Sequence, residues 1–213
     1  MIDVAIIDYK MSNLHSVEAA CRKVGLSCLI TNNHDKIMNS KAAILPGVGA
    51  FGPAISFLKK TGLDCCIKDF VETGKPFIGI CLGMQLLFES SEEFGHHKGL
   101  GLVKGKVKKF QFQKLRNQKY PIPQVGWNKI KKENVDWKGT LLENNNNGDF
   151  LYFVHSYYVE PKESKIILST TMYNNKKYCS SINDKNIFAT QFHPEKSGLV
   201  GIAIYEKLKN NMR

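Results

Sequence analysis

The sequence predicts an α/β fold in which a mostly parallel central sheet is covered by helices on both faces. Short apolar strands alternate with helical segments through the first half of the 213 residues, and this alternation is typical of parallel sheets built from β–α units. Hydrophobic residues make up 43% of the chain and charged residues 23%, as in ordinary globular proteins. We therefore expect a single domain over residues 1–213 with a full core.

The first half supplies the parallel part of the sheet. Short apolar runs bounded by glycine, proline or polar residues are typical of strands, and helical spacing of apolar residues follows them. Asn13 is placed to begin the first helix and Gly25 to end it. We expect strands at Val4–Ile7, Ser27–Ile30, Ala42–Leu45 and around Phe77–Ile80, with helices near Asn13–Val24, Pro53–Lys60, Leu63–Thr73 and from Met84 onward.

The pattern changes after Leu102. From there to about Ile130, short alternating strands with glycine and proline predict an additional small antiparallel β region made of hairpins. A closing helix is expected near Leu199–Leu208, where the apolar residues are spaced for one face. Further strands are expected at Tyr152–Tyr158, Ile166–Thr171, Tyr178–Ile182 and Ile187–Gln191.

Cys81 is the first candidate for chemistry. It follows an apolar strand and stands between Gly79 and Gly83, where the chain turns into a helix. The glycines remove the Cβ atoms that would block a tight strand-to-helix turn, as in a nucleophile elbow with sulfur in place of oxygen. The N-terminus of the following helix favours the thiolate, the reactive form of cysteine. A buried packing cysteine in a glycine-rich turn is the alternative, since short motifs give many false positives.

A second apolar strand ends in His193-Pro194-Glu195. Histidine is suited to take a proton from a thiol near neutral pH and to return it to a leaving amine. Glu195 is placed to orient that histidine, because Pro194 stiffens the link between them. Taken alone, the tripeptide also fits a turn with a solvated glutamate. The carboxyl ends of parallel strands meet at one edge of a sheet, so we expect Cys81 and His193 to come together there.

Six ordered motifs give the chain a family resemblance. They are Asn13-Leu14-x-Ser16-Val17, Leu45-Pro46-Gly47-Val48-Gly49-Ala50-Phe51-Gly52, Gly79-Ile80-Cys81-Leu82-Gly83-Met84-Gln85, Pro123-Gln124-Val125-Gly126-Trp127-Asn128, Tyr152-Phe153-Val154-His155-Ser156-Tyr157 and Gln191-Phe192-His193-Pro194-Glu195-Lys196-Ser197. With these motifs the chain resembles the class I (triad) glutamine amidotransferases over nearly its whole length. More narrowly, it is similar to the glutaminase subunits of imidazole glycerol phosphate synthases, to which the Gly-Trp-Asn and Phe-Val-His-Ser-Tyr segments point.

The resemblance implies a flavodoxin-like fold and glutamine hydrolysis without a cofactor. Cys81 would attack the side-chain amide of glutamine, His193 would carry the proton to the departing ammonia, and Glu195 would hold His193. The oxyanion needs backbone donors near the nucleophile. The residues implied to serve the oxyanion or the glutamine pocket are Gly47, Val48, Gly49, Leu82, Gln85, Ser156 and Tyr157. A packed, helix-capping role also fits Gln85, and a simple β–α turn also fits the glycines.

The resemblance also implies a partner. Ammonia would pass through a channel into a (β/α)8-barrel cyclase subunit, which makes imidazole glycerol phosphate and an aminoimidazole carboxamide ribotide in histidine biosynthesis. Gln124, Trp127 and Asn128 would lie at that interface, with Trp127 as an aromatic anchor; a buried core tryptophan is the alternative. Two other functions stay open. One is a paralogous subunit that supplies ammonia for amidination of a surface-polysaccharide or nucleotide-linked sugar, and the other is a non-catalytic docking subunit of a barrel enzyme.

The loop after the first strand departs from the family pattern. The family usually has Asp-Tyr-Gly-x-Gly-Asn where this chain has Asp8-Tyr9-Lys10-Met11-Ser12-Asn13. If this loop needs a positive φ, lysine is a poor fit there. Before the last hairpin, Asn174-Asn175 replaces a family glycine, and asparagine tolerates a left-handed turn better than most residues.

Charge and cysteine content exclude several other classes. The net charge is +11, but only Arg22, Arg116 and Arg213 are arginines, and the lysines are spread along the chain. Base readout favours arginine, so we expect no nucleic-acid role. There is no apolar run of about eighteen residues and no signal peptide, which predicts a cytoplasmic protein without membrane contact. The six cysteines form no C-x-x-C pair, and His96-His97 is expected in a solvated loop, so we expect neither disulfides nor a metal site.

Overall fold

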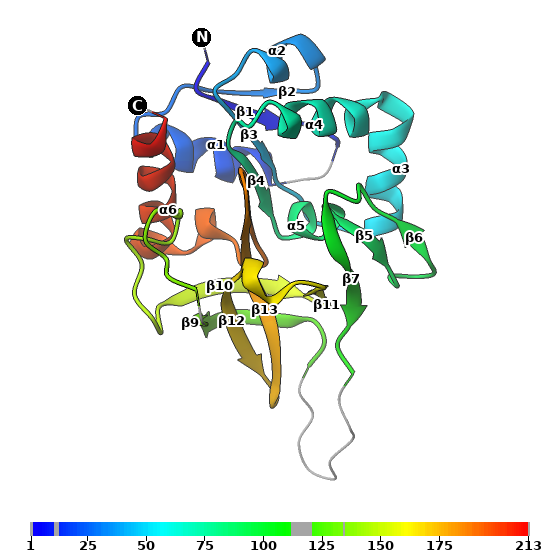
Figure 1. Ribbon diagram of the computed structural model, residues 1–213, viewed down its shortest axis with the longest axis vertical. Coiled ribbons are helices and arrows are strands. Elements are labelled where there is room, and N and C mark those ends of the chain that lie inside the picture. Colours follow the sequence, from blue (N-terminus) through cyan, green and yellow to red (C-terminus); the bar gives the residue numbers. More distant parts are fainter. Residues whose placement is uncertain (1, 11–12, 112–120, 134, 213) are drawn as a thin grey trace.

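An eight-stranded sheet forms the centre of the structure, a computed structural model that describes residues 2–10, 13–111, 121–133 and 135–212 (Figure 1). The five strands on one side are parallel to their neighbours, and the remaining three continue the sheet in antiparallel fashion. This confirms the expected α/β fold with a mostly parallel central sheet. In spatial order the strands are β2 (Cys28–Thr31), β1 (Val4–Ile7), β3 (Ala42–Leu45), β4 (Phe77–Ile80), β14 (Ile187–Thr190), β13 (Lys176–Asp184), β12 (Ile167–Tyr173) and β9 (Lys131–Lys132).

Helices cover both faces of this sheet, as expected. α1 (Leu14–Lys23) and α6 (Gly198–Asn211) lie on one face, and both chain ends lie at the same side of the molecule (Figure 1). The other face carries α2 (His34–Met38), α3 (Phe51–Thr61), α4 (Leu63–Glu72) and the short α5 (Leu82–Leu86). Strand β1 is apolar throughout because both of its faces are buried: Val4 and Ile6 face one core, and Ala5 and Ile7 face the other. No helix in the described ranges has the length and apolar character that crossing a membrane requires.

Two smaller sheets form the additional β region. The larger has the order β11 (Tyr157–Pro161), β7 (Val103–Lys109), β5 (Phe88–Ser91) and β6 (His97–Lys98), and the smaller pairs β10 (Phe150–His155) with β8 (Gln124–Lys129). The single strand expected over Tyr152–Tyr158 is therefore wrong, because the chain passes from one sheet to the other at Ser156. The solvated loop expected at His96-His97 is also wrong for His97, which pairs in β6 and lies 6.4 Å, centroid to centroid, from the ring of Phe51.

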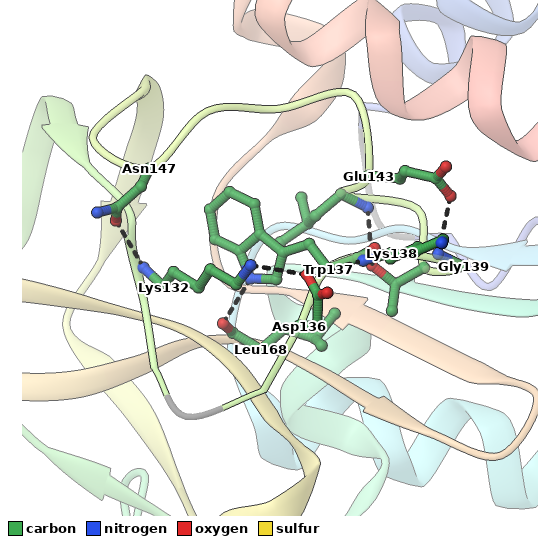
Figure 2. Close-up of polar contacts among 10 residues, drawn as sticks. Lys132, Asp136, Trp137, Lys138, Gly139, Glu143, Asn147 and Leu168 are labelled. Atoms are coloured by element: carbon green, nitrogen blue, oxygen red, sulfur yellow. Dashed lines mark hydrogen bonds and ion pairs between the residues drawn. The ribbon is translucent and has the colours of Figure 1, made fainter.

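The connection between β9 and β10 is anchored by a buried tryptophan. Trp137 donates its Nε1–H to the carbonyl oxygen of Leu168 at 2.7 Å, which ties the connection to β12 (Figure 2). Lys132 adds an ion pair of 2.7 Å to Asp136, and its backbone N–H donates to the Asn147 side chain at 2.8 Å. This segment, together with α6, closes the core on the α1 face.

Left-handed backbone occurs where the sequence departs from the family pattern. Lys10 has a φ of 66°, so the loop after β1 does place a lysine in a conformation that suits glycine better. Met11 and Ser12 of that loop lie outside the described residues. Asn174 and Asn175 have φ values of 46° and 58° in the turn between β12 and β13. This confirms the expected left-handed turn at the asparagine pair.

Candidate active site

Four parallel strands end at one edge of the sheet and deliver the candidate residues there. Strand β1 leads to Tyr9, β3 to Gly47, β4 to Cys81 and β14 to His193. Strands β4 and β14 are direct neighbours, with Ile80 opposite Thr190. The expected convergence of Cys81 and His193 at the carboxyl edge therefore holds, and sheet pairing alone brings their strands together.

Cys81 occupies a sharp turn between β4 and α5. Its φ of 54° and ψ of −107° lie in a region that non-glycine residues rarely adopt. The turn is possible because the neighbouring glycines allow close packing: a Cβ on Gly83 would lie 1.7 Å from the Leu45 carbonyl oxygen, and one on Gly79 would lie 3.0 Å from Leu87 Cδ1. The backbone N–H of Cys81 donates to the Thr190 carbonyl at 2.7 Å, which fixes the turn to β14. These contacts match the geometry of a nucleophile elbow.

His193 and Glu195 form a buried pair beside this turn. His193 Nδ1 lies 2.7 Å from Glu195 Oε1, and both side chains are fully buried. The same carboxylate oxygen accepts a hydrogen bond from the Asn13 side chain. Asn13 is the N-cap residue of α1, as expected, but its side chain makes no capping hydrogen bond. Its amide N–H donates to Glu195 instead. His193 Nε2 is buried, and the Cys81 sulfur interacts with this ring.

The electrostatics of His193 link it to Cys81. Burial lowers the pKa of His193. The negative sulfur of Cys81 and the Glu195 carboxylate raise it by more than burial lowers it, so the pKa of His193 lies above its ordinary value. This is the behaviour of an imidazolium held between two anions. His155 behaves oppositely: burial lowers its pKa to about 4, so this ring is neutral at pH 7. The pair Cys81–His193 can thus exchange a proton, with Glu195 holding the protonated ring.

A cavity of about 170 Å³ opens beside the Cys81 side chain. It is lined by residues from four segments, namely Val48, Gly49, Cys81, Leu82, Gln85, Glu93, Val154, His155, Ser156 and Tyr157. Six of the seven residues implied by the resemblance are among them. Gly47 does not line the cavity; it packs against Tyr9, and a Cβ on Gly47 would lie 1.8 Å from the Tyr9 hydroxyl oxygen. The cavity is below the roughly 300 Å³ at which drug-sized ligands begin to fit, and it suits a ligand of amino-acid size.

The backbone N–H of Leu82, the residue after Cys81, already donates a hydrogen bond within the protein. The N–H of Leu82 donates to the carbonyl oxygen of Gly47 at 3.3 Å. An oxyanion that uses this donor therefore requires the Gly47 carbonyl to turn away.

Comparison with known proteins places the chain in a family. The model of the glutamine amidotransferase class-I family matches residues 5–205. The chain belongs to the class-I glutamine amidotransferases. Among curated relatives, the imidazole glycerol phosphate synthase subunit HisH of Trichormus variabilis is 43% identical over 210 residues, covering 99% of this chain and 96% of that protein. The subunit HisH of Geobacillus thermodenitrificans is 40% identical over 207 residues, covering 97% and 95% of the two chains.

Solved structures agree on the fold of this amidotransferase. The structure of PurLQS from Thermotoga maritima matches with a TM-score of 0.74 at 19% identity, covering 100% of both chains. The glutaminase domain of Trypanosoma brucei CTPS with bound acivicin matches with a TM-score of 0.66 at 14% identity, covering 99% of this chain and 94% of that one. At these identities the likeness concerns the fold alone.

Residues beyond the predicted set also reach the amidotransferase site. The Glu93 carboxylate lines the cavity and accepts the backbone N–H of Phe51 at 2.6 Å; burial raises its pKa, and this hydrogen bond opposes the rise. Gln191 donates toward the Cys81 sulfur at 3.6 Å. Gln191 could have been found from the sequence, since it stands two residues before His193 in the same motif. Glu93 lies in a polar stretch without periodicity, so only the fold places Glu93 at the site.

The expected interface residues of the amidotransferase fall on two faces of the β8–β10 pair. Trp127 is 55% exposed and Val125 is 60% exposed on the outer face. Gln124 is buried on the inner face, where it accepts a hydrogen bond of 3.0 Å from the Tyr178 hydroxyl. Asn128 donates its side-chain N–H to the Met172 carbonyl at 2.8 Å. The exposure of Trp127 excludes the alternative of a buried core tryptophan.

A larger hollow of about 410 Å³ lies at the opposite edge of the same sheet. It is bordered by Phe77 and Ile78 at the start of β4, and by Asn183, Lys185 and Asn186 before β14. Ligands of open parallel sheets bind beyond the carboxyl ends of the strands. The smaller cavity, which contains Cys81, therefore carries the candidate chemistry.

Proposed function

We propose that this chain is the glutaminase subunit of an imidazole glycerol phosphate synthase. In this function it hydrolyses glutamine to glutamate and ammonia and passes the ammonia to a cyclase subunit in histidine biosynthesis. The observation that carries the proposal is the buried Cys81–His193–Glu195 arrangement beside a cavity of amino-acid size. Full-length similarity to HisH subunits supports the synthase in particular.

The geometry supports a thioester mechanism. Cys81, ionised by proton transfer to His193, attacks the side-chain carbonyl carbon of glutamine, and the carbonyl electrons move to oxygen. His193 returns the proton to the departing nitrogen, so ammonia leaves and a γ-glutamyl thioester remains on Cys81. Water then attacks the thioester with His193 as base, which releases glutamate and restores the thiol. Glu195 stabilises the imidazolium in both halves of the reaction.

The lining of the cavity supports glutamine as the ligand. Glu93 supplies a carboxylate to the wall of the cavity, and a carboxylate suits the α-ammonium group of an amino acid. Gln85, Ser156 and the exposed backbone of Gly49 supply polar groups for the α-carboxylate and the amide. These residues orient the substrate with its side-chain amide toward Cys81.

The oxyanion is proposed to form only after a local rearrangement. Once the Gly47 carbonyl leaves the Leu82 N–H, that N–H and a neighbouring N–H of the Gly47–Gly49 turn can donate to the oxyanion. A subunit in this resting state would hydrolyse glutamine slowly without its partner.

The partner is proposed to dock on the outer face of the β8–β10 pair. This face is apolar: Val125 and Trp127 are exposed opposite Val154 and Tyr152 in the register of the two strands. Strand β10 also supports the catalytic centre, because the Tyr152 carbonyl accepts the His193 N–H at 2.9 Å and the Val154 carbonyl lies 3.8 Å from the Cys81 sulfur. A barrel-shaped cyclase on this face would therefore contact the strand behind both the nucleophile and the base.

Glutamate release tests the proposal directly. We expect low release from the chain alone and a strong increase when the histidine-pathway cyclase and its nucleotide substrate are added. Cys81→Ser should abolish release with or without the partner. Full glutamine-dependent activity in Cys81→Ser would instead support a non-catalytic docking subunit. Stimulation by a sugar-modifying partner in place of the cyclase would support the paralogous subunit.

A further inference from the structure

Gln191 contacts the proposed nucleophile directly. Its Nε2 lies 3.6 Å from the Cys81 Sγ, and the whole side chain is buried (0% exposed). The backbone N–H of Gln191 donates to the Ser180 carbonyl at 2.9 Å, so β13 fixes its position. A buried amide N–H requires an acceptor. For the Gln191 side chain, the Cys81 sulfur is placed to be that acceptor.

The orientation of the Gln191 amide follows from its neighbours. The Gln85 Nε2 donates to the Tyr157 carbonyl at 3.1 Å and to Gln191 Oε1 at 3.0 Å. A backbone carbonyl only accepts, so Gln85 must present its NH2 group to Tyr157, and with it a second proton to Gln191. Gln191 then presents its oxygen to Gln85 and its NH2 group to the sulfur. The reverse orientation would set two NH2 groups against each other.

A donor at the sulfur favours its charged form. A thiolate accepts an N–H more strongly than a neutral thiol does, because the hydrogen bond is charge-assisted. A second polar neighbour of the sulfur acts in the opposite sense: the Val154 carbonyl at 3.8 Å can only accept, which suits a protonated thiol. Gln191 is thus the uncharged donor that offsets a carbonyl facing the same atom.

We propose that Gln191 donates its amide proton to the Cys81 sulfur and holds the ionised thiol in position for attack on glutamine. The role rests on the proposed glutaminase function. Gln85, which lines the cavity, is the other end of the same hydrogen-bond chain. Substrate contacts at Gln85 are therefore connected to the nucleophile through one intervening side chain.

Other titratable groups also lie near the Cys81 thiol and influence its reactivity. His193 faces it from the turn after β14, with Glu195 behind that ring, and Tyr9 faces it from the end of β1. Glu93 lines the same cavity as the thiol. Because substitutions at Gln191 leave all four groups in place, a change in thiol reactivity in an uncharged variant can be assigned to the lost donor.

The test is the pH dependence of Cys81 alkylation by iodoacetamide, followed on the Cys81 peptide by mass spectrometry. Gln191→Glu keeps an oxygen for Gln85 but replaces the donor, and Gln191→Met removes the donor without adding charge. We expect both variants to shift the alkylation midpoint upward, Gln191→Glu by about one pH unit or more. At a pH below the wild-type midpoint its alkylation should then fall about tenfold.

Thr190→Val is the matched control. Thr190 is the preceding residue, equally buried, and its hydroxyl donates to the Phe192 carbonyl at 2.9 Å instead of to the sulfur. We expect Thr190→Val to leave the alkylation midpoint unchanged. An unchanged midpoint in folded Gln191→Glu and Gln191→Met would overturn the inference. Alkylation requires no glutamine turnover, so a failure of the proposed function would show separately, as absent glutamate release from the wild-type complex.

Discussion

The Gly47 carbonyl oxygen accepts the backbone N–H of Leu82 at 3.3 Å, so the residue after the proposed nucleophile has its donor occupied. On its other side, Gly47 packs directly against the Tyr9 hydroxyl. That hydroxyl is fully buried and has no hydrogen-bond partner among the described residues. The turn that must move for oxyanion stabilisation is therefore held between Leu82 and a tyrosine that forms no polar bond to it.

We predict that Gly47→Ala abolishes glutaminase activity and costs about 1–3 kcal/mol of unfolding free energy through overpacking. The added Cβ would lie 1.8 Å from the Tyr9 hydroxyl oxygen and 3.0 Å from Tyr9 Cζ. Tyr9→Phe alone should be as stable as the wild type or more so, since it removes a buried hydroxyl without a partner. The double variant should regain part of the lost stability. Urea unfolding measures these differences, and equal stability of Gly47→Ala with and without Tyr9→Phe would contradict the prediction.

We predict that Asn13→Asp lowers kcat about tenfold or more with little change in KM. The Asn13 amide donates to the Glu195 oxygen that also receives His193, and a hydrogen bond to a charged group contributes about 1.5–3 kcal/mol. Aspartate tolerates the left-handed backbone at this position, where φ is 86°. Steady-state glutamate release with the partner present measures the effect.

Asn33→Asp provides the control for this charge change. Asn33 accepts the Lys36 N–H at 2.9 Å as the N-cap of α2, and aspartate caps helices equally well. We expect wild-type kcat in Asn33→Asp. A similar fall of kcat in both variants would mean that the charge change acts on the whole protein instead of on Glu195.

We predict that acid weakens the fold through His155. Burial lowers the pKa of His155 to about 4 in the folded protein, below the ordinary value of about 6.5. As the pH falls from about 6.5 to 4, the unfolded chain binds this proton first, so the folded state loses stability, by up to roughly 3 kcal/mol. Urea unfolding at several pH values should show the stability difference between wild type and His155→Gln shrinking toward acid. A difference that stays constant with pH would count against a neutral, buried His155.

We predict that Trp127→Ala leaves basal glutamate release and stability nearly unchanged but reduces stimulation by the cyclase. Trp127 is 55% exposed, so its truncation removes little core packing. As an aromatic anchor at an interface, it would contribute about 2 kcal/mol or more to binding. Titration of the cyclase into both proteins measures the apparent affinity. Equal stimulation at equal cyclase concentration would remove Trp127 from the proposed interface.

The sequence predicts those parts of the fold that local chemistry determines. The strands at Val4–Ile7 and Ala42–Leu45 match their expected bounds because both faces of each are buried, which leaves short, wholly apolar runs. Helix α2 has five mostly polar residues, and three of the four residues of β5 are polar, so neither carries a periodic signal. The break at Ser156 follows from pairing with two different sheets, which no local pattern encodes.

The candidate site divides in the same way. Cys81 and His193 are recognisable because each follows a strand with its own turn chemistry. The role of Asn13 is not recognisable from the sequence, because its partner Glu195 lies 182 residues further along the chain. Only the folded structure reveals that the Asn13 amide donates to a carboxylate instead of capping a helix. Glu93 and the orientation of Gln191 depend likewise on contacts between distant segments.

The direct pairing of β4 with β14 has a consequence for control of the enzyme. Adjacent strands keep a separation of about 4.8 Å as long as the sheet exists, and the register sets Ile80 beside Thr190. Sheet pairing thus fixes the strand ends from which the nucleophile and the base project. The Gly47–Gly49 turn, held to Leu82 by a peptide hydrogen bond, is the part that we expect to respond. We therefore expect activation to act through rotation of a peptide unit in this turn, while β4 and β14 keep the backbones of Cys81 and His193 in place.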